Sequence, residues 1–378
     1  MMMSWKNCKK ILVIRADNLG DLLMSSPAIR SLKETFGAEI TVLTSSMASG
    51  VAAQIPEISS VITYDLPWVK TGKPFRTEDF FDIVGTLERE RFDAAVIFTV
   101  YSQNPLPAAM LAYLAKIPRR LAYCRENPYG LLTDWVPDKE PYSLIRHQVK
   151  RDLHLTASVG ATTANERLCL TVRKDMKDQM FAKLRTVGAE PEKPWLILHP
   201  GVSEDKRKYP ADRWIEAGRV LVSDLGYQLL LTGTAGEKEL TDRIAAGIGS
   251  GAFSIAGALS LPEFILLNHL APLVIAVNTG TIHIAAATGT PVVVLYALTN
   301  PQHAPWKVKG KVLPFGVPEN LRSRNEVIRH VYEHLFIENV PMATPAEIVA
   351  AARSVLTEAA HEPIPELVSL RSHHEDLL

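Results

Sequence analysis

Short runs of aliphatic and β-branched residues recur along the chain, separated by longer amphipathic stretches. The runs occupy residues 11–14, 40–43, 61–64, 95–100, 195–199, 228–232, 253–256, 273–277 and 292–296. Because they are apolar almost without interruption, they predict strands buried on both faces, as in a parallel sheet covered by helices. The stretches between them repeat apolar residues at helical spacing, for example Ile29, Leu32 and Phe36. This alternation predicts a doubly wound α/β fold.

The alternation divides the chain into two parts. It fades between about residues 101 and 165, where YSQNPLP, RENPYG and WVPDKEPYS supply turn residues, and it begins again at Trp195. We therefore expect two Rossmann-like domains, residues 1–175 and 176–360, followed by a polar tail over 361–378. Within the second domain, the segment TPAEIVAAARSVLTEA predicts a late helix over 344–358 that begins with a capping box.

Composition narrows the class of protein. With 378 residues, 47% hydrophobic and 22% charged, the chain is typical of a globular enzyme with sizeable cores. Lys plus Arg and Asp plus Glu both number 41, so overall charge gives no reason to expect nucleic acid as a partner. The three cysteines lie far apart, which argues against a disulfide framework or a zinc site and suits a reducing compartment. Since no secretion signal or membrane-spanning run is visible, we expect a cytoplasmic protein; peripheral contact at the inner face of a membrane stays open.

The first candidate for chemistry is Asp21, in RADNLGDLLMSSPAIRSL (residues 15–32), directly after the first predicted strand. A carboxylate at such a turn can cap a helix or act as a catalytic base. Ser26, before a proline, is a better cap, so we expect residues 16–25 to form a compact loop or short turn with Asp21 free to point into a cleft. Arg15 is expected to lie near Asp21 and to keep it ionised. From the residues alone both readings stay open.

The second candidate is a phosphate site without the usual motifs, since neither a P-loop nor a GxGxxG turn is present. The segment HPGVSEDKRKYPADRW (199–214) places Lys206, Arg207 and Lys208 just before a predicted helix. Cationic side chains beside helix-terminal amides can bind a diphosphate. A solvated run of basic residues is the alternative.

Two further turns follow strands of the same domain. In AVNTGTIHIAAATGTPVVVLY, Asn278, Thr279 and Gly280 end a strand before a small-residue helix that carries His283. Small residues let a ligand approach the backbone, and a helix N-terminus favours an anion. The alternative is a tightly packed helix with a core histidine.

The other turn, in LLLTGTAGEKE, carries Thr234 and Glu237. The carboxylate could accept hydrogen bonds from ribose hydroxyls or a base amine, or it could provide favourable charge at a helix start. Each of these three turns is a weak signal alone. Their occurrence on strands of one domain makes a nucleotide-binding site the stronger interpretation.

Taken in order, these blocks resemble the heptosyltransferases of glycosyltransferase family 9. The resemblance runs over about residues 10–358 and rests on the pattern Arg15, Asp17, Leu19-Gly20-Asp21 and Pro27, on LHPG (198–201) with the basic cluster and Tyr209-Pro210, and on RHQVKRDLHLTASVG (146–160), AGALSLPEF (256–264) and NTGTIHIAAATGTP.

The resemblance implies a GT-B fold, with two facing Rossmann-like domains and parallel sheets. It implies an inverting transferase that moves a sugar, usually heptose from ADP-heptose, to a glycolipid or lipopolysaccharide-core acceptor without a cofactor or metal. The acceptor would bind the N-terminal domain and the nucleotide-sugar the C-terminal one. Asp21 matches the general base, Arg207 or its neighbour Lys206 matches the lysine that holds the donor phosphates, and Thr279, Gly280 and His283 match the donor block.

On the acceptor side we expect Arg15, Asp17, Arg119 and Arg120. The last two stand in the basic segment AKIPRRLAYCRE, which would suit an acidic acceptor or could equally be solvated charge.

Two departures from the family pattern leave the donor open. The family's aspartate before Thr/Ser-Gly is Asn278 here, and its Gly-Pro-Thr after the last strand is Ala297-Leu298-Thr299. A transferase of the same fold that uses another nucleotide-sugar, or a protein or small-molecule acceptor, is therefore one alternative. A catalytically silent nucleotide-sugar binding module is another.

Overall fold

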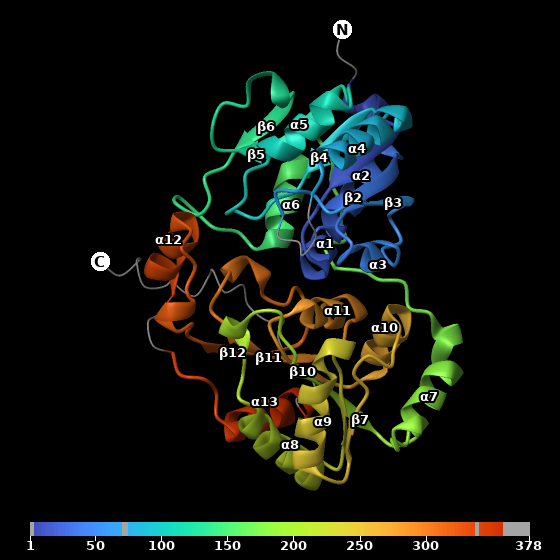
Figure 1. Ribbon diagram of the computed structural model, residues 1–378, viewed down its shortest axis with the longest axis vertical. Coiled ribbons are helices and arrows are strands. Elements are labelled where there is room, and N and C mark those ends of the chain that lie inside the picture. Colours follow the sequence, from blue (N-terminus) through green and yellow to red (C-terminus); the bar gives the residue numbers. More distant parts are fainter. Residues whose placement is uncertain (1–3, 70–74, 337–339, 358–378) are drawn as a thin grey trace. The chain divides into compact units, whose positions relative to one another are not determined.

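Two six-stranded parallel sheets organise the chain (Figure 1). The computed structural model describes residues 4–69, 75–336 and 340–357. The chain divides into two units, Met1–Cys169 and Leu170–Leu378, whereas the sequence suggested a boundary at residue 175. The predicted tail over 361–378 lies outside the described residues.

The N-terminal sheet has the strand order β3-β2-β1-β4-β5-β6. Its strands are β1 (Lys10–Ile14), β2 (Glu39–Thr44), β3 (Ser60–Thr63), β4 (Ala94–Ile97), β5 (Arg119–Cys124) and β6 (Asp134–Pro137). The helices between them are α1 (Leu19–Met24), α2 (Ser26–Phe36), α3 (Ser49–Ala52), α4 (Thr77–Glu90), α5 (Leu106–Leu114) and α6 (Gln148–Ala157), with 3-10 turns η1 (Trp5–Asn7) and η2 (Tyr129–Leu131).

Helices cover both faces of this sheet, as the continuous apolar strands predict. Leu12 and Ile14 of β1 pack in one core cluster with Ile83 of α4 and Leu111 of α5. On the other face, Tyr123 of β5 contacts α6, where its ring stacks on His154. The central strand β1 is therefore enclosed, and only its carboxyl end is open to chemistry.

The C-terminal sheet repeats this topology in the order β12-β11-β10-β7-β8-β9. Its strands are β7 (Trp195–His199), β8 (Gln228–Leu231), β9 (Ala252–Ser254), β10 (Val274–Val277), β11 (Val292–Ala297) and β12 (Gly310–Phe315). The helices are α7 (Lys177–Thr186), α8 (Ala211–Leu225), α9 (Lys238–Ile248), α10 (Leu261–Leu270), α11 (Gly280–Thr288), α12 (Glu326–Leu335) and α13 (Pro345–Thr357). The 3-10 turns are η3 (Lys174–Met176), η4 (Asp205–Arg207), η5 (Ala235–Glu237), η6 (Pro301–His303) and η7 (Glu319–Leu321).

Every predicted strand overlaps an observed one, but three strands were missed. The expectation that the strand pattern fades over 101–165 was wrong, because β5 and β6 lie there. β5 begins with two arginines, and β6 is an edge strand whose residues alternate between partial burial and exposure. The edge strand β12 has the same half-exposed character. Strands of this kind lack the continuous apolar run of a central parallel strand.

The late helix is confirmed at its start. The backbone N–H and the hydroxyl of Thr344 donate to Glu347 at 2.7 and 2.9 Å, which forms the predicted capping box of α13. The three cysteines are free, as expected. Among the described residues, no helix combines the length and apolarity needed to cross a membrane.

Strand order reverses at one place in each sheet, between β1 and β4 and between β7 and β10. At such a point the connections leave β-strands in opposite directions, and a crevice opens outside the carboxyl ends of the strands. The edge of each sheet that carries Asp21 or Asn278 is therefore where a ligand site is expected.

In the C-terminal unit, the loop that holds the basic cluster is anchored by aromatic packing. Trp214 of α8 is fully buried, and its ring meets that of Tyr209 edge-on at a centroid distance of 4.9 Å. The Tyr209 hydroxyl donates to the carbonyl oxygen of Ala343 at 2.6 Å. These contacts fix the chain directly after η4.

We predict that Trp214→Ala lowers the free energy of unfolding of the C-terminal unit by about 3–5 kcal/mol, because it leaves a large cavity beside Tyr209. Trp214→Phe is the matched control and should cost much less, since it keeps a ring and removes an indole N–H that has no hydrogen-bond partner among the residues that the structure describes. Denaturant unfolding of both variants checks this. Equal losses would contradict the packing argument.

Candidate functional site

Asp21 lies in a helix and not in a loop. Helix α1 begins at Leu19, Asn18 is its N-cap, and the Asn18 backbone N–H donates to Asp21 Oδ2 at 3.2 Å. The two residues form a capping box, so the capping role considered for Asp21 is real. The expectation that residues 16–25 form a compact loop or short turn was wrong, because Leu19–Met24 is helical.

Ser26 does not cap α2 as expected. It is the first helical residue, and its buried hydroxyl has no hydrogen-bond partner among the described residues. The preceding Ser25 adopts helical backbone angles, and its hydroxyl donates to the Asp21 carbonyl at 3.2 Å and to Asp152 Oδ2 at 2.7 Å. The two helices therefore follow each other almost directly, and the serine links them to α6.

A buried guanidinium holds two carboxylates at the carboxyl end of β1. Arg15 has no exposed surface; its Nε lies 3.2 Å from Asp17 Oδ2 and its Nη2 lies 3.4 Å from Asp21 Oδ1. The predicted proximity of Arg15 and Asp21 is thus confirmed. Burial acts to lower the pKa of Arg15, but Asp17, Asp21 and Asp152 outweigh it and raise the pKa. A buried charge needs such partners because desolvation alone would be prohibitive.

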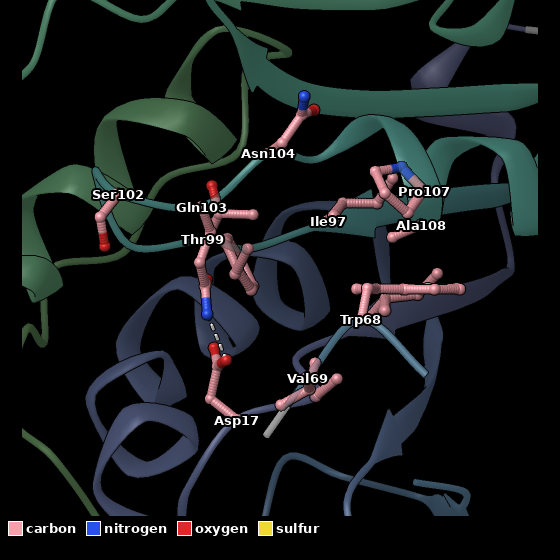
Figure 2. A pocket seen from close by; sticks show the side chains of 13 residues that line it. Asp17, Trp68, Val69, Ile97, Thr99, Ser102, Gln103, Asn104, Pro107 and Ala108 are labelled. Atoms are coloured by element: carbon pink, nitrogen blue, oxygen red, sulfur yellow. Dashed lines mark hydrogen bonds between the residues drawn. The ribbon is translucent and has the colours of Figure 1, made fainter. Parts of the chain in front are cut away.

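The two carboxylates differ in their other contacts. Asp21 is 8% exposed and accepts from a backbone N–H at the start of α1. Asp17 accepts a hydrogen bond of 2.5 Å from Gln103 Nε2, which Figure 2 shows. Burial raises the pKa of Asp17, against the lowering effect of Arg15 and of the Gln103 hydrogen bond. The site thus contains two carboxylates of distinct character beside one cation.

A third carboxylate, Asp152 of α6, joins this network. Its Oδ1 accepts from Gln148 Nε2 at 2.8 Å and its Oδ2 accepts from Ser25. Burial raises the pKa of Asp152 to about 6, in spite of the opposing charge of Arg15. Asp152 lies in the segment 146–160 that resembles the family pattern, but nothing in the sequence marks it as a site residue, because only the fold brings it to β1.

A cavity of about 250 Å³ opens at the carboxyl ends of β1 and β4, where the strand order reverses. It is lined by Ile14, Ala16, Asp17, Trp68, Val69, Ile97, Phe98, Thr99, Ser102, Gln103, Asn104, Pro107 and Ala108. Of the residues expected on the acceptor side, Asp17 lines the cavity and Arg15 lies beside Asp17. Trp68 and Gln103 were missed, since no motif marks them in the sequence.

Arg119 and Arg120 do not belong to this site. They begin β5 and pair in register with Ala94 and Ala95, so they lie at the amino edge of the sheet, away from Asp17. Arg119 pairs with Asp134 at 3.2 Å, and Arg120 donates to backbone carbonyls of the chain around η2, among them Leu131 at 2.7 Å. Their expected role in binding the acceptor stays a prediction. Sequence reasoning could not tell which edge of the sheet they occupy, because it missed β5.

The C-terminal unit gathers the remaining candidates at the carboxyl ends of β7, β8 and β10. His199 ends β7, and its Nδ1 lies 2.9 Å from the Thr232 hydroxyl. Burial lowers the pKa of His199 to about 4, and the Glu237 carboxylate opposes this only in part. His199 is therefore a neutral ring near neutral pH.

Thr234 and Glu237 cap η5. The backbone N–H and hydroxyl of Thr234 donate to Glu237 Oε2 at 2.7 and 2.9 Å. The other oxygen faces Gly201, where a Cβ would stand 2.2 Å from Glu237 Oε1. The glycine of LHPG thus makes room for this carboxylate. Glu237 therefore helps to cap the start of η5 through its Oε2 atom, which was one of the two interpretations of this carboxylate. A role of Glu237 in donor binding stays a prediction.

The basic cluster is unequal in its contacts. Arg207 Nη1 donates to the carbonyl oxygen of Asn278 at 3.2 Å, which ties η4 to the end of β10. Lys206 and Arg207 both lie 3.3 Å from Glu204 Oε2. Lys208 pairs with Asp205, and its side chain is 65% exposed. Arg207 is therefore held at the end of β10 and Lys206 shares its carboxylate partner, whereas Lys208 pairs elsewhere and is exposed. A role of the cluster in donor binding stays a prediction.

Asn278 has a structural task that explains its identity. Its Oδ1 accepts from the Ala297 N–H and its Nδ2 donates to the Ala297 carbonyl, both at 3.1 Å. This bridge joins the ends of β10 and β11 and requires one acceptor and one donor. An aspartate would set an oxygen against the Ala297 carbonyl oxygen.

Helix α11 begins directly after this bridge. Thr279 occupies its N-cap position without a side-chain capping bond, and Gly280 is the first helical residue. His283 is buried one turn later, with its ring edge-on to His303 at 6.5 Å. The backbone of the Thr279-Gly280 turn is thus the part of this block nearest the strand end.

Comparison with known proteins gives a consistent family assignment. The model of glycosyltransferase family 9 (heptosyltransferase) matches residues 81–325. Lipopolysaccharide heptosyltransferase 2 of Salmonella typhimurium is 27% identical over 312 residues, which is 78% of this chain and 85% of that protein. Arg15 and Asp21 precede the residues that the family model matches, so their roles stay predictions.

Two solved structures share the fold. A family 9 glycosyltransferase from Veillonella parvula superposes with a TM-score of 0.76 at 17% identity, covering 95% of this chain and 99% of its own. The Escherichia coli ADP-heptose LPS heptosyltransferase II gives a TM-score of 0.68 at 23% identity, covering 92% and 98%. The predicted α/β fold class, GT-B with two Rossmann-like domains, is confirmed.

We predict a pH dependence of stability that originates from Asp152. Its pKa of about 6 exceeds the ordinary value of 3.8, so the folded state binds this proton more tightly than the unfolded state. The group therefore adds stability as the pH falls through 6 and loses it as the pH rises. The Asp152→Asn variant cannot bind this proton and lacks the gain. The difference in unfolding free energy between wild type and variant should therefore grow in favour of the wild type as the pH falls from about 7.5 to 5. A constant difference would contradict the assignment.

Proposed function

Because this chain belongs to glycosyltransferase family 9 (heptosyltransferase), we propose that it transfers heptose from ADP-heptose to a lipopolysaccharide-core acceptor, with inversion at the anomeric carbon. The names of similar proteins support both substrates, since they include a lipopolysaccharide heptosyltransferase and an ADP-heptose LPS heptosyltransferase. The observation that carries the proposal is the charged side chains at the reversal of strand order in each sheet: carboxylates beside β1 and cations beside β10.

Asp21 is proposed as the general base. An acceptor hydroxyl is far too weak an acid to ionise at neutral pH, so a carboxylate must take its proton as the new bond forms. The acceptor oxygen attacks the anomeric carbon while the bond from that carbon to the phosphate oxygen breaks. The proton passes to Asp21, and ADP leaves with the electron pair. Arg15 balances the negative charge of Asp21, and the capping bond from Asn18 fixes the carboxylate at the head of α1.

The departing ADP gains negative charge, which cations and helix-terminal amides stabilise. We assign this task to Lys206, Arg207 and the Thr279-Gly280 turn at the start of α11. Arg207 is the stronger candidate of the two cations because its contact with the Asn278 carbonyl already holds it at β10. Glu237, Thr234 and His283 remain proposed contributors to the nucleotide pocket.

One observation favours a second candidate, a transferase that uses a different nucleotide-sugar. Asn278 is neutral, and both ends of its amide are engaged by Ala297. The donor pocket therefore lacks a carboxylate at a position where the family pattern has one. This alternative retains the base and the phosphate site and changes only the donor.

A glycolipid acceptor would bring the enzyme to a membrane surface. We therefore also propose a cytoplasmic location with peripheral contact at the inner membrane face. Fractionation of cells into soluble and membrane-associated protein, with and without high salt, tests this separately from the chemistry.

The assignment of the base predicts that Asp21→Asn lowers kcat by about 10²–10⁴-fold, because the acceptor hydroxyl loses its proton acceptor. The dissociation constant for the donor should change only a few-fold. Asp17→Asn is the matched control, since it also removes a carboxylate from Arg15 but keeps Asp21. Near-normal turnover in Asp21→Asn, or a larger kcat loss in Asp17→Asn, would remove Asp21 as the base.

The contacts of the basic cluster predict unequal effects on donor binding. Arg207→Ala and Lys206→Ala should each weaken ADP binding, measured by calorimetry, with the larger effect for Arg207. Lys208→Ala removes the same charge from the exposed side of η4 and serves as the control, with ADP affinity close to wild type. If Lys208→Ala has the largest effect, the phosphate site has been misplaced.

A further inference from the structure

Asp152 is a buried carboxylate to which the proposed reaction gives no role. It lies on α6, is 1% exposed, and both of its oxygens are engaged: Oδ1 accepts from Gln148 and Oδ2 accepts from Ser25. Helix α6 contacts α1, the helix that carries Asp21, and Figure 1 shows the two side by side. Asp152 is therefore placed to act on the proposed base through other groups.

The first connection from Asp152 to Asp21 runs through Ser25. The Ser25 hydroxyl donates to Asp152 Oδ2 at 2.7 Å and also lies 3.2 Å from the Asp21 carbonyl oxygen. The Ser25 backbone N–H donates to that same carbonyl at 3.3 Å. Ser25 therefore closes the last turn of α1, and Asp152 holds Ser25. Because α1 has only six residues, too few to be stable alone, fixing its end also fixes Asp21.

The second connection is electrostatic and runs through Arg15. The fully buried guanidinium lies 3.4 Å from Asp21 Oδ1. Although burial acts to lower the pKa of Arg15, the charges of Asp21 and Asp152 both act to raise it. Buried charges interact strongly because little water screens them. An ionised Asp152 therefore offsets part of the positive charge that Arg15 presents to Asp21.

This offset favours general-base catalysis. A cation beside a carboxylate stabilises the ionised form and weakens its hold on a proton, whereas a further anion near that cation restores part of the hold. A carboxylate that holds a proton more firmly is a stronger base, and the rate of proton transfer follows its strength. Loss of the charge on Asp152 should therefore slow the step in which Asp21 accepts the proton.

Other titratable side chains in the described part of the chain also act on Asp152. Burial raises its pKa to about 6, while Arg15 of β1 and Arg151 of α6 act to lower it. The Tyr123 hydroxyl of β5 responds to its charge, and Asp17 shares Arg15 with it. Asp152 is therefore largely ionised at about pH 8 and largely protonated at about pH 5.

We propose that Asp152 is a positioning residue for Asp21. It holds the end of α1 through Ser25, and its charge reaches the proposed base through Arg15. The inference rests on the proposed function and adds to it a residue outside the lining of the cavity at β1 and β4. Turnover then depends on the ionisation of a group that acts only through its neighbours.

The pH dependence of turnover tests the role of the charge. ADP release by the full-length protein is measured with ADP-heptose and a lipopolysaccharide-core oligosaccharide. The kcat of the wild type should rise in a step near pH 6, and Asp152→Asn should lack that step. The wild type should exceed the variant about threefold or more at about pH 8 and approach it at about pH 5. A merely structural role would give the same ratio at every pH, which would overturn the proposal.

Ser25→Ala separates the hydrogen bond from the charge and keeps the proposal testable if Asp152→Asn folds poorly. Burial raises the pKa of Asp152, and Arg15 and the Ser25 hydrogen bond lower it, so loss of that bond should move the step in kcat to higher pH. Ser31→Ala is the matched control, because the buried Ser31 hydroxyl also joins α2 to α6, through Thr156 at 2.9 Å. Its profile should match wild type. A step that stays in place in Ser25→Ala would contradict the link.

Carbon-13 NMR of the Asp21 carboxyl group separates this inference from the proposed function, because it needs no turnover. The signal is identified by its loss in Asp21→Asn. In the wild type it should shift with an inflection near pH 6, and Asp152→Asn should abolish that inflection. If the inflection is present but ADP-heptose is not a substrate, the coupling stands and the donor assignment is wrong. If ADP is released but the Asp21 signal has no inflection near pH 6, the function stands and the inference fails.

Discussion

The buried guanidinium of Arg15 is the interaction on which the N-terminal site depends. It has no exposed surface, and no guanidinium nitrogen makes a hydrogen bond within the described part of the chain. Its charge is therefore balanced almost wholly by the nearby carboxylates. A buried cation in this state is costly when a partner is lost, which ties the positions of Asp17 and Asp21 to each other. One cation thus organises both the proposed base, Asp21, and the second carboxylate, Asp17.

In the C-terminal unit, uncharged groups fix the positions of the candidate site residues. Asn278 joins β10 to β11 through both ends of its amide, and its own carbonyl holds Arg207. Gly201 leaves the space that Glu237 occupies beside the end of β7. The result is a turn whose side chains are already committed to the fold, beside the two cations, Lys206 and Arg207, that we propose for the donor phosphates. Asn278, where the family pattern has an aspartate, therefore has a structural explanation in its bridge to Ala297.

Local patterns predicted the fold better than the site. The central strands were found because parallel strands buried on both faces are continuously apolar, whereas β5, β6 and β12 begin with charged residues or lie half exposed at an edge. The cap of α2 was misjudged because Ser25 bonds to Asp152, a partner 127 residues away in sequence. The edge of the sheet at which Arg119 and Arg120 lie could not be predicted either, because the strand that carries them was missed. Gln103, Trp68 and Asp152 have no local signal at all, since only tertiary contacts bring them to β1.

The central claim is that the two sites serve transfer from an ADP-linked sugar, and a donor titration tests it most directly. Purified protein would be titrated by calorimetry with ADP, UDP, GDP, CDP and TDP, and then with ADP-heptose. We expect ADP to bind more tightly than the other nucleotides and ADP-heptose to bind at least as tightly as ADP. A clear preference for another nucleoside diphosphate would contradict the ADP-heptose assignment, and binding of none of them would contradict the proposed donor site itself.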